Sequence, residues 1–402
     1  MTRLLLNSLC ATTVLCSAYA HAGVTIDELS EAVQTGKVAL NFRYRLEHVD
    51  QDGIDNEANA STLRSRLTYT SGKIKENWSF GIEADSVALI GDERYNSTEN
   101  GLAEFSVVAD PEGFDLNQSF IKYEKDGYSV TTGTQRILHG NQRFVGGVGW
   151  RQNEQTYDAV RVKFKPMDNL AIDYSYVWNV HRIFGPEAGA QPSDWDSDSH
   201  FLLATLTPAE GHKVEGFAYL LDFDNDNGIP NSTATYGVTY QGKLGPVKLN
   251  ATYASQSEDG DSMLDYDADY LAVELATSIE KVTLKAGIET LGSDDGEAAF
   301  RTPLATLHKF QGWADKFLLT PADGIEDTYF AVAAPIGPVK VSVIYHDYQA
   351  DDGDRDFGDE INFVANYALS KNVKFQLKAA DFSAEDVMTD TSKYWFSTII
   401  NL

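Results

Sequence analysis

The chain has 402 residues, of which 60 are acidic and 32 are basic, so its formal net charge is −28. Such a charge argues against a nucleic-acid binder, because a protein that neutralises phosphates must present positive surface. After residue 22, no apolar run approaches the roughly 18 residues that a membrane-spanning helix needs, which leaves a soluble secreted protein or a transmembrane β-barrel.

Residues 1–22 are expected to be a signal peptide for Sec export. Arg3 supplies a positive n-region, residues 4–17 are apolar, and Ala20-His21-Ala22 is a small-x-small cleavage site. Because the two cysteines lie in this segment, the mature chain is expected to contain no disulfide, no thiol nucleophile and no thiolate metal ligand. These cysteines are Cys10 and Cys16.

Residues 23–37 are expected to form a short periplasmic segment ahead of the barrel. Thr25 is followed three residues later by Glu28, the pattern of a capping box in which each side chain binds the other residue's backbone N–H. A short helix is therefore predicted before the first strand.

Residues 38–402 show period-2 alternation, with aliphatic and aromatic residues on one parity and mostly polar residues on the other. In the first segment, Leu40, Phe42 and Tyr44 alternate with Arg43 and Arg45. Segments of about 8 to 11 alternating residues are typical of strands with one polar and one apolar face. Strands are predicted at 38–49, 62–70, 78–88, 116–123, 128–136, 156–164, 170–180, 200–207, 214–223, 233–241, 246–254, 267–276, 282–290, 327–333, 339–346, 360–368, 373–381 and 394–402.

The predicted connections alternate in length. Short ones such as 124–127, 165–169 and 242–245 follow even-numbered strands, and most long ones follow odd-numbered strands. A soluble β-sandwich has no reason to separate connection lengths in this way, and no repeat near about 40–50 residues supports a propeller.

This pattern predicts an all-β fold, a transmembrane antiparallel β-barrel of about 18 strands with short periplasmic turns and long extracellular loops. Its location is then the Gram-negative cell outer membrane, where outer-membrane lipid and lipopolysaccharide surround it. We expect a monomer, with a trimer as the alternative.

Strand parity also predicts which side chains line the pore. If the apolar parity faces lipid, the strands of clear parity turn more basic than acidic residues inward, and a basic wall of low dielectric favours anions. The inward basic residues are Arg43, Arg45, Arg64, Arg66, Arg161, Lys163, Lys248, Lys285, Lys340, Lys374 and Lys378, and the inward acids are Glu47, Glu83, Asp85, Asp173, Glu274 and Glu289.

The simpler alternative is that these charges pair across neighbouring strands without a role in transport. Arg43 and Arg45 lie beside Arg64 and Arg66 on adjacent predicted strands with few acids, which favours a role in transport. A general diffusion porin with an acidic vestibule is the alternative function, because the acidic excess of the chain lies in loops. These loops are 50–57, 92–112, 222–226, 258–269 and 347–360.

Two long loops, 138–155 and 300–325, differ from the acidic ones because they are rich in apolar residues. Exposing such segments to water is costly, so we expect them to fold inward as constrictions; the alternative is that they cap the barrel mouth. Their aromatic and cationic side chains suit acidic sugars. The candidate solute-contacting residues on these loops are Arg143, Arg151, His308, Lys309 and Trp313, in addition to Arg43, Arg45, Arg64, Arg66, Arg161, Lys163 and Lys285 on the wall.

Four segments carry a resemblance to a known family: FRYRLEHVDQ at 42–51, ASTLRSRLTY at 60–69, the run 133–162 and the run 302–321. Together they resemble the broad alginate-export or porin-like outer-membrane family. The resemblance implies an 18-stranded barrel whose basic pore passes anionic polysaccharides or oligosaccharides such as alginate. Export of a polymer and uptake of oligosaccharides need the same wall, so the direction stays open.

No cofactor or metal site is predicted. Asp222, Asp224 and Asp226 alternate as in a Ca²⁺ loop, but the Gly at position six and the Glu at position twelve of an EF-hand are missing, so solvated loop charge is the better interpretation. An enzyme is not expected, since the chain lacks G-x-S-x-G and H-E-x-x-H. In the alternative of a barrel enzyme such as an outer-membrane lipase, the candidate bases would be His139, His308 and His346.

Overall fold

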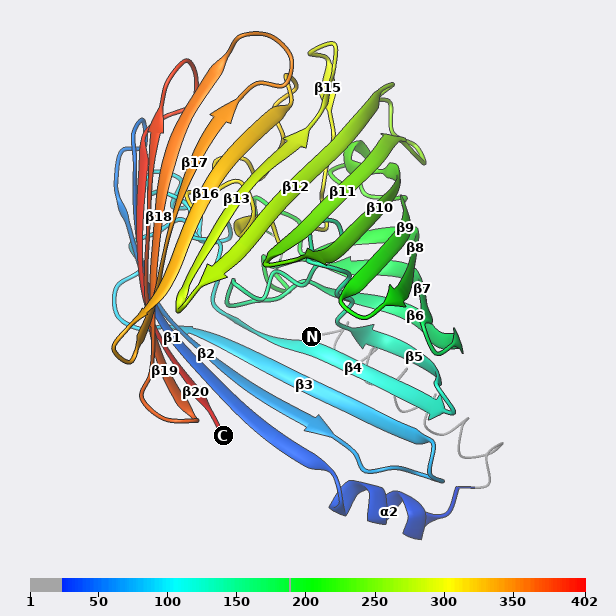
Figure 1. The fold of residues 1–402 in the computed structure, drawn as a ribbon. Coiled ribbons are helices and arrows are strands. Elements are labelled where there is room, and N and C mark those ends of the chain that lie inside the picture. The colour runs from blue at the N-terminus through cyan, green and yellow to red at the C-terminus, as the bar shows by residue number, and fades with distance from the viewer. Residues whose placement is uncertain (1–23, 188) are drawn as a thin grey trace.

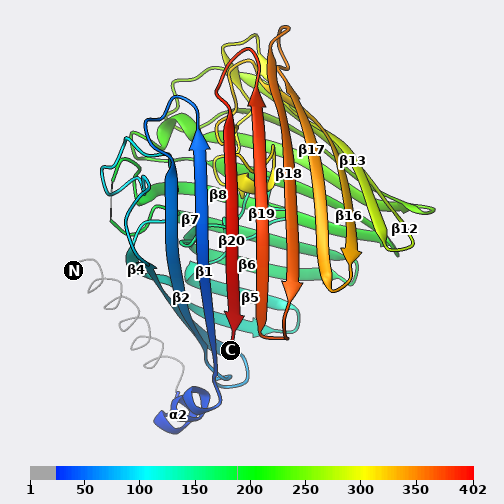
Figure 2. The ribbon, with the colours of Figure 1, turned by 90° about the vertical axis from the view of Figure 1, so that its left-hand side faces the viewer.

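The computed structural model describes residues 24–187 and 189–402, so the expected signal peptide lies outside the described residues. Eighteen long antiparallel strands form one closed barrel (Figure 1). The first and last strands, β1 and β20, pair from Asn41 with Asn401 to Gln51 with Thr391, and Figure 2 shows them side by side. Closure pairs every strand edge, as a sheet in lipid requires, and the predicted fold class is confirmed.

All eighteen predicted strands are present, and most extend beyond their predicted ends. They are β1 (Lys37–Gln51), β2 (Ala58–Thr70), β3 (Trp78–Leu89), β4 (Gly113–Lys125), β5 (Tyr128–Gln135), β6 (Thr156–Met167), β7 (Leu170–His181), β8 (Asp194–Ala209), β9 (His212–Leu221), β10 (Thr233–Leu244), β11 (Val247–Glu258), β12 (Asp267–Ile279), β13 (Val282–Leu291), β16 (Ile325–Ile336), β17 (Val339–Gln349), β18 (Asp356–Ala368), β19 (Val373–Ala384) and β20 (Thr391–Asn401).

The largest difference from the prediction is the start of β8, at Asp194 instead of 200. The pairing of β7 with β8 shifts register between Val177 and Asn179, which interrupts the regular alternation. Beyond the shift, Asp196 and Asp198 occupy exposed positions between buried residues, so the apolar signal that marks other strands is missing there.

Connections of unequal length divide the barrel into two ends. At the turn end, as we call it, connections such as 126–127, 280–281 and 337–338 are short. At the loop end lie the long connections, including 90–112, 136–155 and 292–324. The last of these carries a small hairpin of β14 (Ser293–Asp294) and β15 (Ala298–Ala299) and the 3-10 turn η2 (Leu307–Lys309); another 3-10 turn, η1 (Ile229–Asn231), lies in the loop before β10.

A short helix, α2 (Ile26–Gln34), precedes the barrel at the turn end (Figure 2). The predicted capping box is present, because the Glu28 N–H donates to Thr25 Oγ1 at 3.2 Å and the Thr25 N–H donates to Glu28 Oε2 at 2.7 Å. The Tyr69 hydroxyl on β2 donates to the Val33 carbonyl at 2.9 Å and holds the helix to the wall. Among the described residues, no helix is long and apolar enough to cross a membrane.

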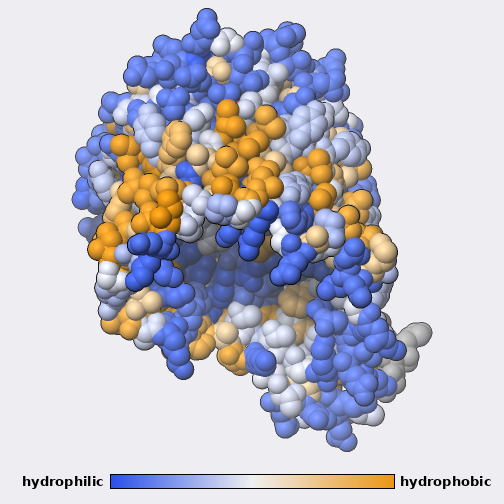
Figure 3. Space-filling view, in the orientation of Figure 1, coloured by the Kyte–Doolittle hydropathy of each residue, from blue (hydrophilic) through white to orange (hydrophobic). Residues whose placement is uncertain are grey.

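Side-chain parity follows the predicted pattern. Large apolar residues on the outward positions are exposed, as Leu67, Leu202 and Leu377 show, whereas inward Arg45 and Glu47 are buried. In Figure 3 orange apolar side chains lie on the outer surface, and a hollow lined by hydrophilic residues opens beneath them. A barrel with an apolar exterior and a polar interior is the form that lipid outside and water inside select.

The lumen holds a hydrophobic core toward the loop end. Phe144 from the loop 136–155 packs against Phe217 on β9, with ring centres 4.8 Å apart, and against Tyr270 on β12, at 5.2 Å. Phe300 from the loop 292–324 packs on the same Tyr270 ring at 5.5 Å. Burying these rings stabilises both loops inside the barrel.

Candidate functional site

The loop 136–155 crosses the lumen and is fixed to the β1 wall by arginines. Arg43 on β1 donates to Gln152 Oε1 and to the Gly149 carbonyl, both at 2.9 Å, and also contacts the Arg151 carbonyl. Arg151 in turn donates to both carboxylate oxygens of Glu47, the shortest at 3.0 Å. These charge-assisted bonds link loop and wall at several points.

Arg143 fixes the same loop to the opposite wall and to its partner loop. Its Nε donates to Glu289 Oε1 on β13 at 2.6 Å, and its Nη1 and Nη2 donate to Thr302 Oγ1 and Gln311 Oε1, each at 3.0 Å. The side chain is 1% exposed. Arg143 is therefore a structural anchor between the two loops.

The loop 292–324 is held by wall residues of β18 and β20. Glu360 Oε1 accepts from the backbone N–H groups of Trp313 and Ala314, at 2.5 and 2.9 Å. Asp315 accepts from Lys393 Nζ at 2.9 Å and from His308 Nδ1 at 2.7 Å. Residues 313–315 of this loop are thus tied to two wall strands by buried charges.

A wall cation lies where the two loops meet. The Lys378 ammonium on β19 is 4.0 Å from the Trp150 ring centre and 3.7 Å from that of Trp313, and it contacts His308 Nε2. Trp150 stacks on the His308 ring at 4.3 Å, and the Arg45 guanidinium lies 4.0 Å above the same indole. Burial, the first cause, lowers the pKa of His308 well below its usual value, so the ring stays neutral and can accept from Lys378.

The loops cover several of the residues predicted to contact solute. Loop residues pack over these side chains and leave each of them less than a tenth exposed. Their hydrogen bonds and ion pairs join the loops to the wall and to each other. The covered residues are Arg43, Arg45, Arg64, Arg143, Arg151 and His308, and Arg161 is at the limit with 9%.

A line of basic side chains follows one wall, and two of its members, Arg136 and Lys163, are clearly accessible. These four, which we call the cationic track, follow one another from the middle of the barrel toward the turn end. The exposed fractions of their side chains are 10%, 26%, 10% and 50%, in the order Arg66, Arg136, Arg161 and Lys163.

The part of the track farther from the turn end is a pair of arginines, Arg66 and Arg136, that share carboxylates. Arg66 binds Asp85 on β3 with two donors, Nε at 2.7 Å and Nη2 at 2.5 Å. Its Nη1 donates to Glu154 Oε1 of the loop 136–155 at 2.6 Å. Arg136 contacts the second oxygen of Glu154 and also Glu83 on β3.

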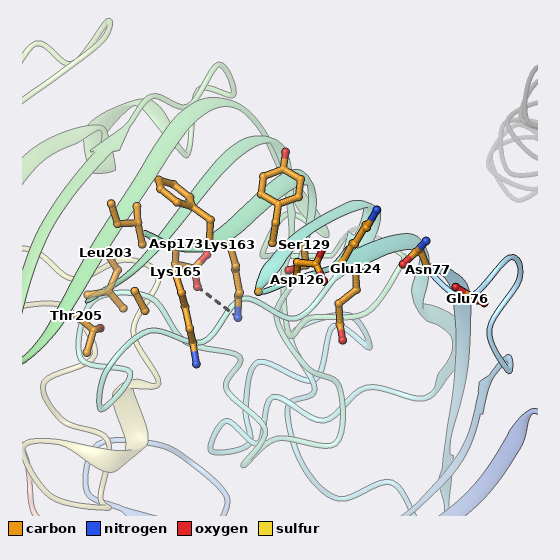
Figure 4. Close-up of a pocket in the computed structure, with 16 residues that line it drawn as sticks. Glu76, Asn77, Glu124, Asp126, Ser129, Lys163, Lys165, Asp173, Leu203 and Thr205 are labelled. Carbon is orange, nitrogen blue, oxygen red and sulfur yellow. Dashed lines mark ion pairs between the residues drawn. The ribbon is translucent and has the colours of Figure 1, made fainter. Parts of the chain in front are cut away.

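The other part of the track, Arg161 and Lys163, extends to the turn end. Arg161 on β6 donates twice to Asp173 on β7, at 2.8 and 2.6 Å, and once to the Arg136 carbonyl at 3.1 Å. Lys163 lies 3.4 Å from the same Asp173. Figure 4 shows this ion pair beside a cavity of about 690 Å³, which Lys165, Thr205 and the turn 124–129 also line.

Arg136 was missing from the predicted site. It directly follows β5, whose sequence YSVTTGTQ does not alternate clearly between apolar and polar residues. The sequence did offer one indication of an inward position, because Arg136 lies just before the loop that was expected to fold into the lumen.

The expectation that few acids lie near the wall arginines is wrong. The loop 90–112 brings Asp110 to 3.8 Å from Arg45, and the loop 136–155 brings Glu154 to 3.9 Å from Arg64. These carboxylates are distant in sequence from the arginines that they approach, so strand periodicity could not place them.

The three remaining predicted residues, Lys285, Lys309 and Trp313, lie on β13 and on the loop 292–324, away from the cationic track. Lys285 on β13 is exposed and donates to Glu274 at 3.1 Å, and Lys309 donates to the Asn141 carbonyl at 2.8 Å. Trp313 is half-buried against Lys378. Lys285 and Lys309 therefore add accessible positive charge opposite the cationic track.

The candidate bases of the enzyme alternative are occupied by structural contacts. His139 lies 3.2 Å from the Tyr219 hydroxyl and 3.5 Å from Asp173, and His346 contacts Asp327 at 2.9 Å. Within 24–187 and 189–402, no group of three or more His, Cys, Asp or Glu is arranged to hold a metal ion.

Comparisons with known proteins agree with this architecture. The family model described as Alginate export matches residues 35–274. Crystal structures with a similar fold include Acinetobacter baumannii OccAB4, with a TM-score of 0.70, 14% identity, and coverage of 91% of this chain and 98% of that one. For the crystal structure of Pseudomonas aeruginosa OpdK with vanillate, the TM-score is 0.71 and the identity is 12%, with coverage of 92% of this chain and 99% of that one. At these identities the likeness concerns the fold, and no curated protein sequence matches the chain.

Proposed function

Since the chain belongs to the alginate export family and forms an outer-membrane channel, we propose that its cargo is anionic, with acidic polysaccharides or oligosaccharides such as alginate as the leading class. The described residues, 24–187 and 189–402, supply the barrel, the inward loops and the charged lumen that such a channel needs.

The cationic track is the observation that carries this proposal. Guanidinium groups present a planar fork of donors that matches a carboxylate, and Arg136 is the most exposed arginine of the track. Lys163 continues the line of charge to the mouth at the turn end. A chain of uronate residues could exchange its carboxylates from one cation to the next along this wall.

The surroundings of the track strengthen its effect. A lumen wall backed by lipid has a low dielectric, which focuses the field of the charges that line it. Lys285 and Lys309 place further positive charge across the lumen. OpdK, which shares the fold, was crystallised with vanillate, a carboxylate, and this supports small anions as cargo of such barrels.

One observation favours the general diffusion porin with an acidic vestibule. Each cation of the track contacts a carboxylate, from Glu83, Asp85, Glu154 or Asp173, so the local net charge is small. The loop end also carries acids such as Asp351 and Asp352. On this alternative, the loops would set a preference for cations.

Reversal potentials in planar bilayers separate the two functions. The substitutions Arg66→Gln, Arg136→Gln and Arg161→Gln together should shift the reversal potential toward cations, because they remove the accessible donors. Neutralising the loop acids with Asp351→Asn, Asp352→Asn and Asp354→Asn is the matched control and should change it little. If only the loop variant changes selectivity, the general porin is the better account.

Further features of the chain follow from the same function. We propose that residues 1–22 are removed on Sec export, that 23–37 lies in the periplasm, and that the barrel works as a monomer within lipid and lipopolysaccharide. Mass spectrometry of the mature protein should give an N-terminus at Gly23. An intact N-terminus on the membrane-inserted protein would contradict the proposed processing.

A further inference from the structure

Three arginines converge on one loop carboxylate. Glu154 Oε1 accepts from Arg66 Nη1 at 2.6 Å, and the second oxygen contacts Arg136 Nε. Arg64 Nη1 lies 3.9 Å from Oε1. Glu154 thus occupies the position that a carboxylate from solution would take if it bound to this part of the cationic track.

The arginines are held in place without Glu154. Asp85 binds Arg66 with two hydrogen bonds, and Glu83 contacts Arg136 and lies 3.4 Å from Arg66 Nε. Both acids belong to the wall strand β3. Within the group of Arg64, Arg66, Arg136, Glu83 and Asp85, the net charge is +1, and Glu154 brings it to zero.

Moving Glu154 aside requires rotation of its side chain and no opening of the loop. The backbone on either side is anchored, because Gln152 binds Arg43 at 2.9 Å and the Gln155 N–H donates to the Gly147 carbonyl at 2.8 Å. The Glu154 side chain is 9% exposed and Arg136 is 26% exposed, so the contact lies at the border of the open lumen.

We propose that Arg66 and Arg136 form a carboxylate-binding site, that Glu154 fills it while no cargo is present, and that a cargo carboxylate enters by displacing Glu154. This inference rests on the proposed function and adds a binding site and a selection step to it. The ligand class is a sugar acid with several carboxylates, namely an oligo-uronate.

The preference for several carboxylates follows from competition. Glu154 is tethered beside the arginines, and a tethered group acts at an effective concentration in the millimolar range or above. A single free carboxylate competes poorly with it. An oligo-uronate that also contacts Arg161 and Lys163 gains from multivalency and can displace it.

Glu154 remains an ionised competitor at neutral pH. Burial alone would raise the pKa of Glu154, but the charges of Arg66 and Arg136 and their hydrogen bonds outweigh burial and lower it to about 2. Exchange therefore replaces one carboxylate by another, and no proton has to move.

The test measures block of the channel current by three solutes: galacturonate, trigalacturonate and neutral maltotriose. In the full-length Glu154→Gln protein, we expect the affinity for galacturonate to rise about tenfold, because its competitor is gone. The affinity for trigalacturonate should rise less, so the preference for the trimer over the monomer should shrink. Maltotriose should block both proteins equally.

Glu289→Gln is the matched control. It removes another buried carboxylate that binds a loop arginine, Arg143, away from the track. We expect it to leave both uronate affinities unchanged. Glu154→Asp serves as a second variant with intact charge, and its shorter side chain should give a smaller gain for galacturonate than Glu154→Gln. Heat-modifiable migration on gels reports folding of each variant.

These variants distinguish failure of the displacement inference from failure of the proposed function. If Arg136→Gln weakens trigalacturonate block while Glu154→Gln and Glu154→Asp leave the affinity for galacturonate unchanged, the displacement inference is wrong and the proposed function stands. If Arg66→Gln and Arg136→Gln change neither uronate block nor anion selectivity, the proposed function itself fails. An equal gain from Glu289→Gln would assign the effect to general loosening of the loops and would also overturn the inference.

Discussion

Lys378 on the wall and Trp313 on an inward loop form a cation–π pair, with the ammonium nitrogen 3.7 Å from the ring centre. Trp150 on the other loop lies 4.0 Å from the same nitrogen. One wall cation therefore binds the aromatic side chains of both loops. A desolvated pair of this kind contributes about 2 kcal/mol, so the two loops depend on each other's position.

Lys378→Gln should loosen both loops. It removes the charge that Trp150 and Trp313 bind and the donor to His308. We expect more frequent fluctuations of the single-channel current, by roughly tenfold for a loss of about 1.4 kcal/mol. Lys374→Gln, an inward lysine on the same strand nearer the turn end, is the control and should resemble the wild type. Equal current noise in the two variants would count against the cation–π contact.

Arg143→Ala should free the loop 292–324 from the β13 wall. The substitution removes hydrogen bonds to Thr302 and Gln311 and leaves Glu289 as a buried charge without its arginine, a change that typically costs about 3–5 kcal/mol. Limited proteolysis of the folded barrel should then show new cleavage within 292–324. Arg301→Ala removes an exposed contact to the Pro230 carbonyl and should remain resistant. Equal cleavage of both variants would contradict an anchoring role for Arg143.

Gly312 is required for both its backbone conformation and its lack of a side chain. Its φ is +76°, and a Cβ there would lie 2.2 Å from Glu360 Oε2 and 2.3 Å from the Tyr348 hydroxyl. Gly312→Ala should therefore lower the thermal midpoint more than Gly353→Ala, where φ is +86° but no atom lies within 4 Å. Gly353→Ala introduces only backbone strain, about 1–2 kcal/mol, whereas Gly312→Ala introduces both strain and steric crowding. Similar losses in the two variants would show that crowding is unimportant.

Acid should weaken the contact of Glu154 with Arg66 and Arg136. Because the pKa of Glu154 falls from 4.5 to about 2 in the folded state, its stabilisation is complete above pH 4.5 and is lost as the pH falls toward 2. The difference in thermal midpoint between wild type and Glu154→Gln should stay constant above pH 4.5 and shrink below it. A difference that already shrinks above pH 5 would show that the arginines do not hold this carboxylate.

Strand number and parity could be predicted because each strand has one face toward lipid and one toward polar groups. The alternation of Phe42 and Tyr44 with Arg43 and Arg45 is a local property of the sequence, and it placed the arginines on the inward face. The closed ring follows from pairing each strand with its neighbours in the chain.

The composition of the site could not be predicted in the same way. Asp110 and Glu154 reach the wall arginines only because two long loops fold inward, and local periodicity carries no information on contacts between residues so distant in sequence. The same loops bury Arg45 and Arg143, which strand periodicity alone would leave open to the lumen. Arg136 was missed because it follows β5, whose sequence YSVTTGTQ shows no clear alternation from which an inward parity could be read.

The reversal potential of the wild-type channel across a salt gradient tests the central claim most directly. A lumen lined by the cationic track should favour anions at low salt, and the preference should weaken as salt rises, since screening acts over roughly 10 Å at 0.1 M and 3 Å at 1 M. A preference for cations at low salt, or an anion preference that does not change with salt, would contradict the proposal that the track selects the cargo.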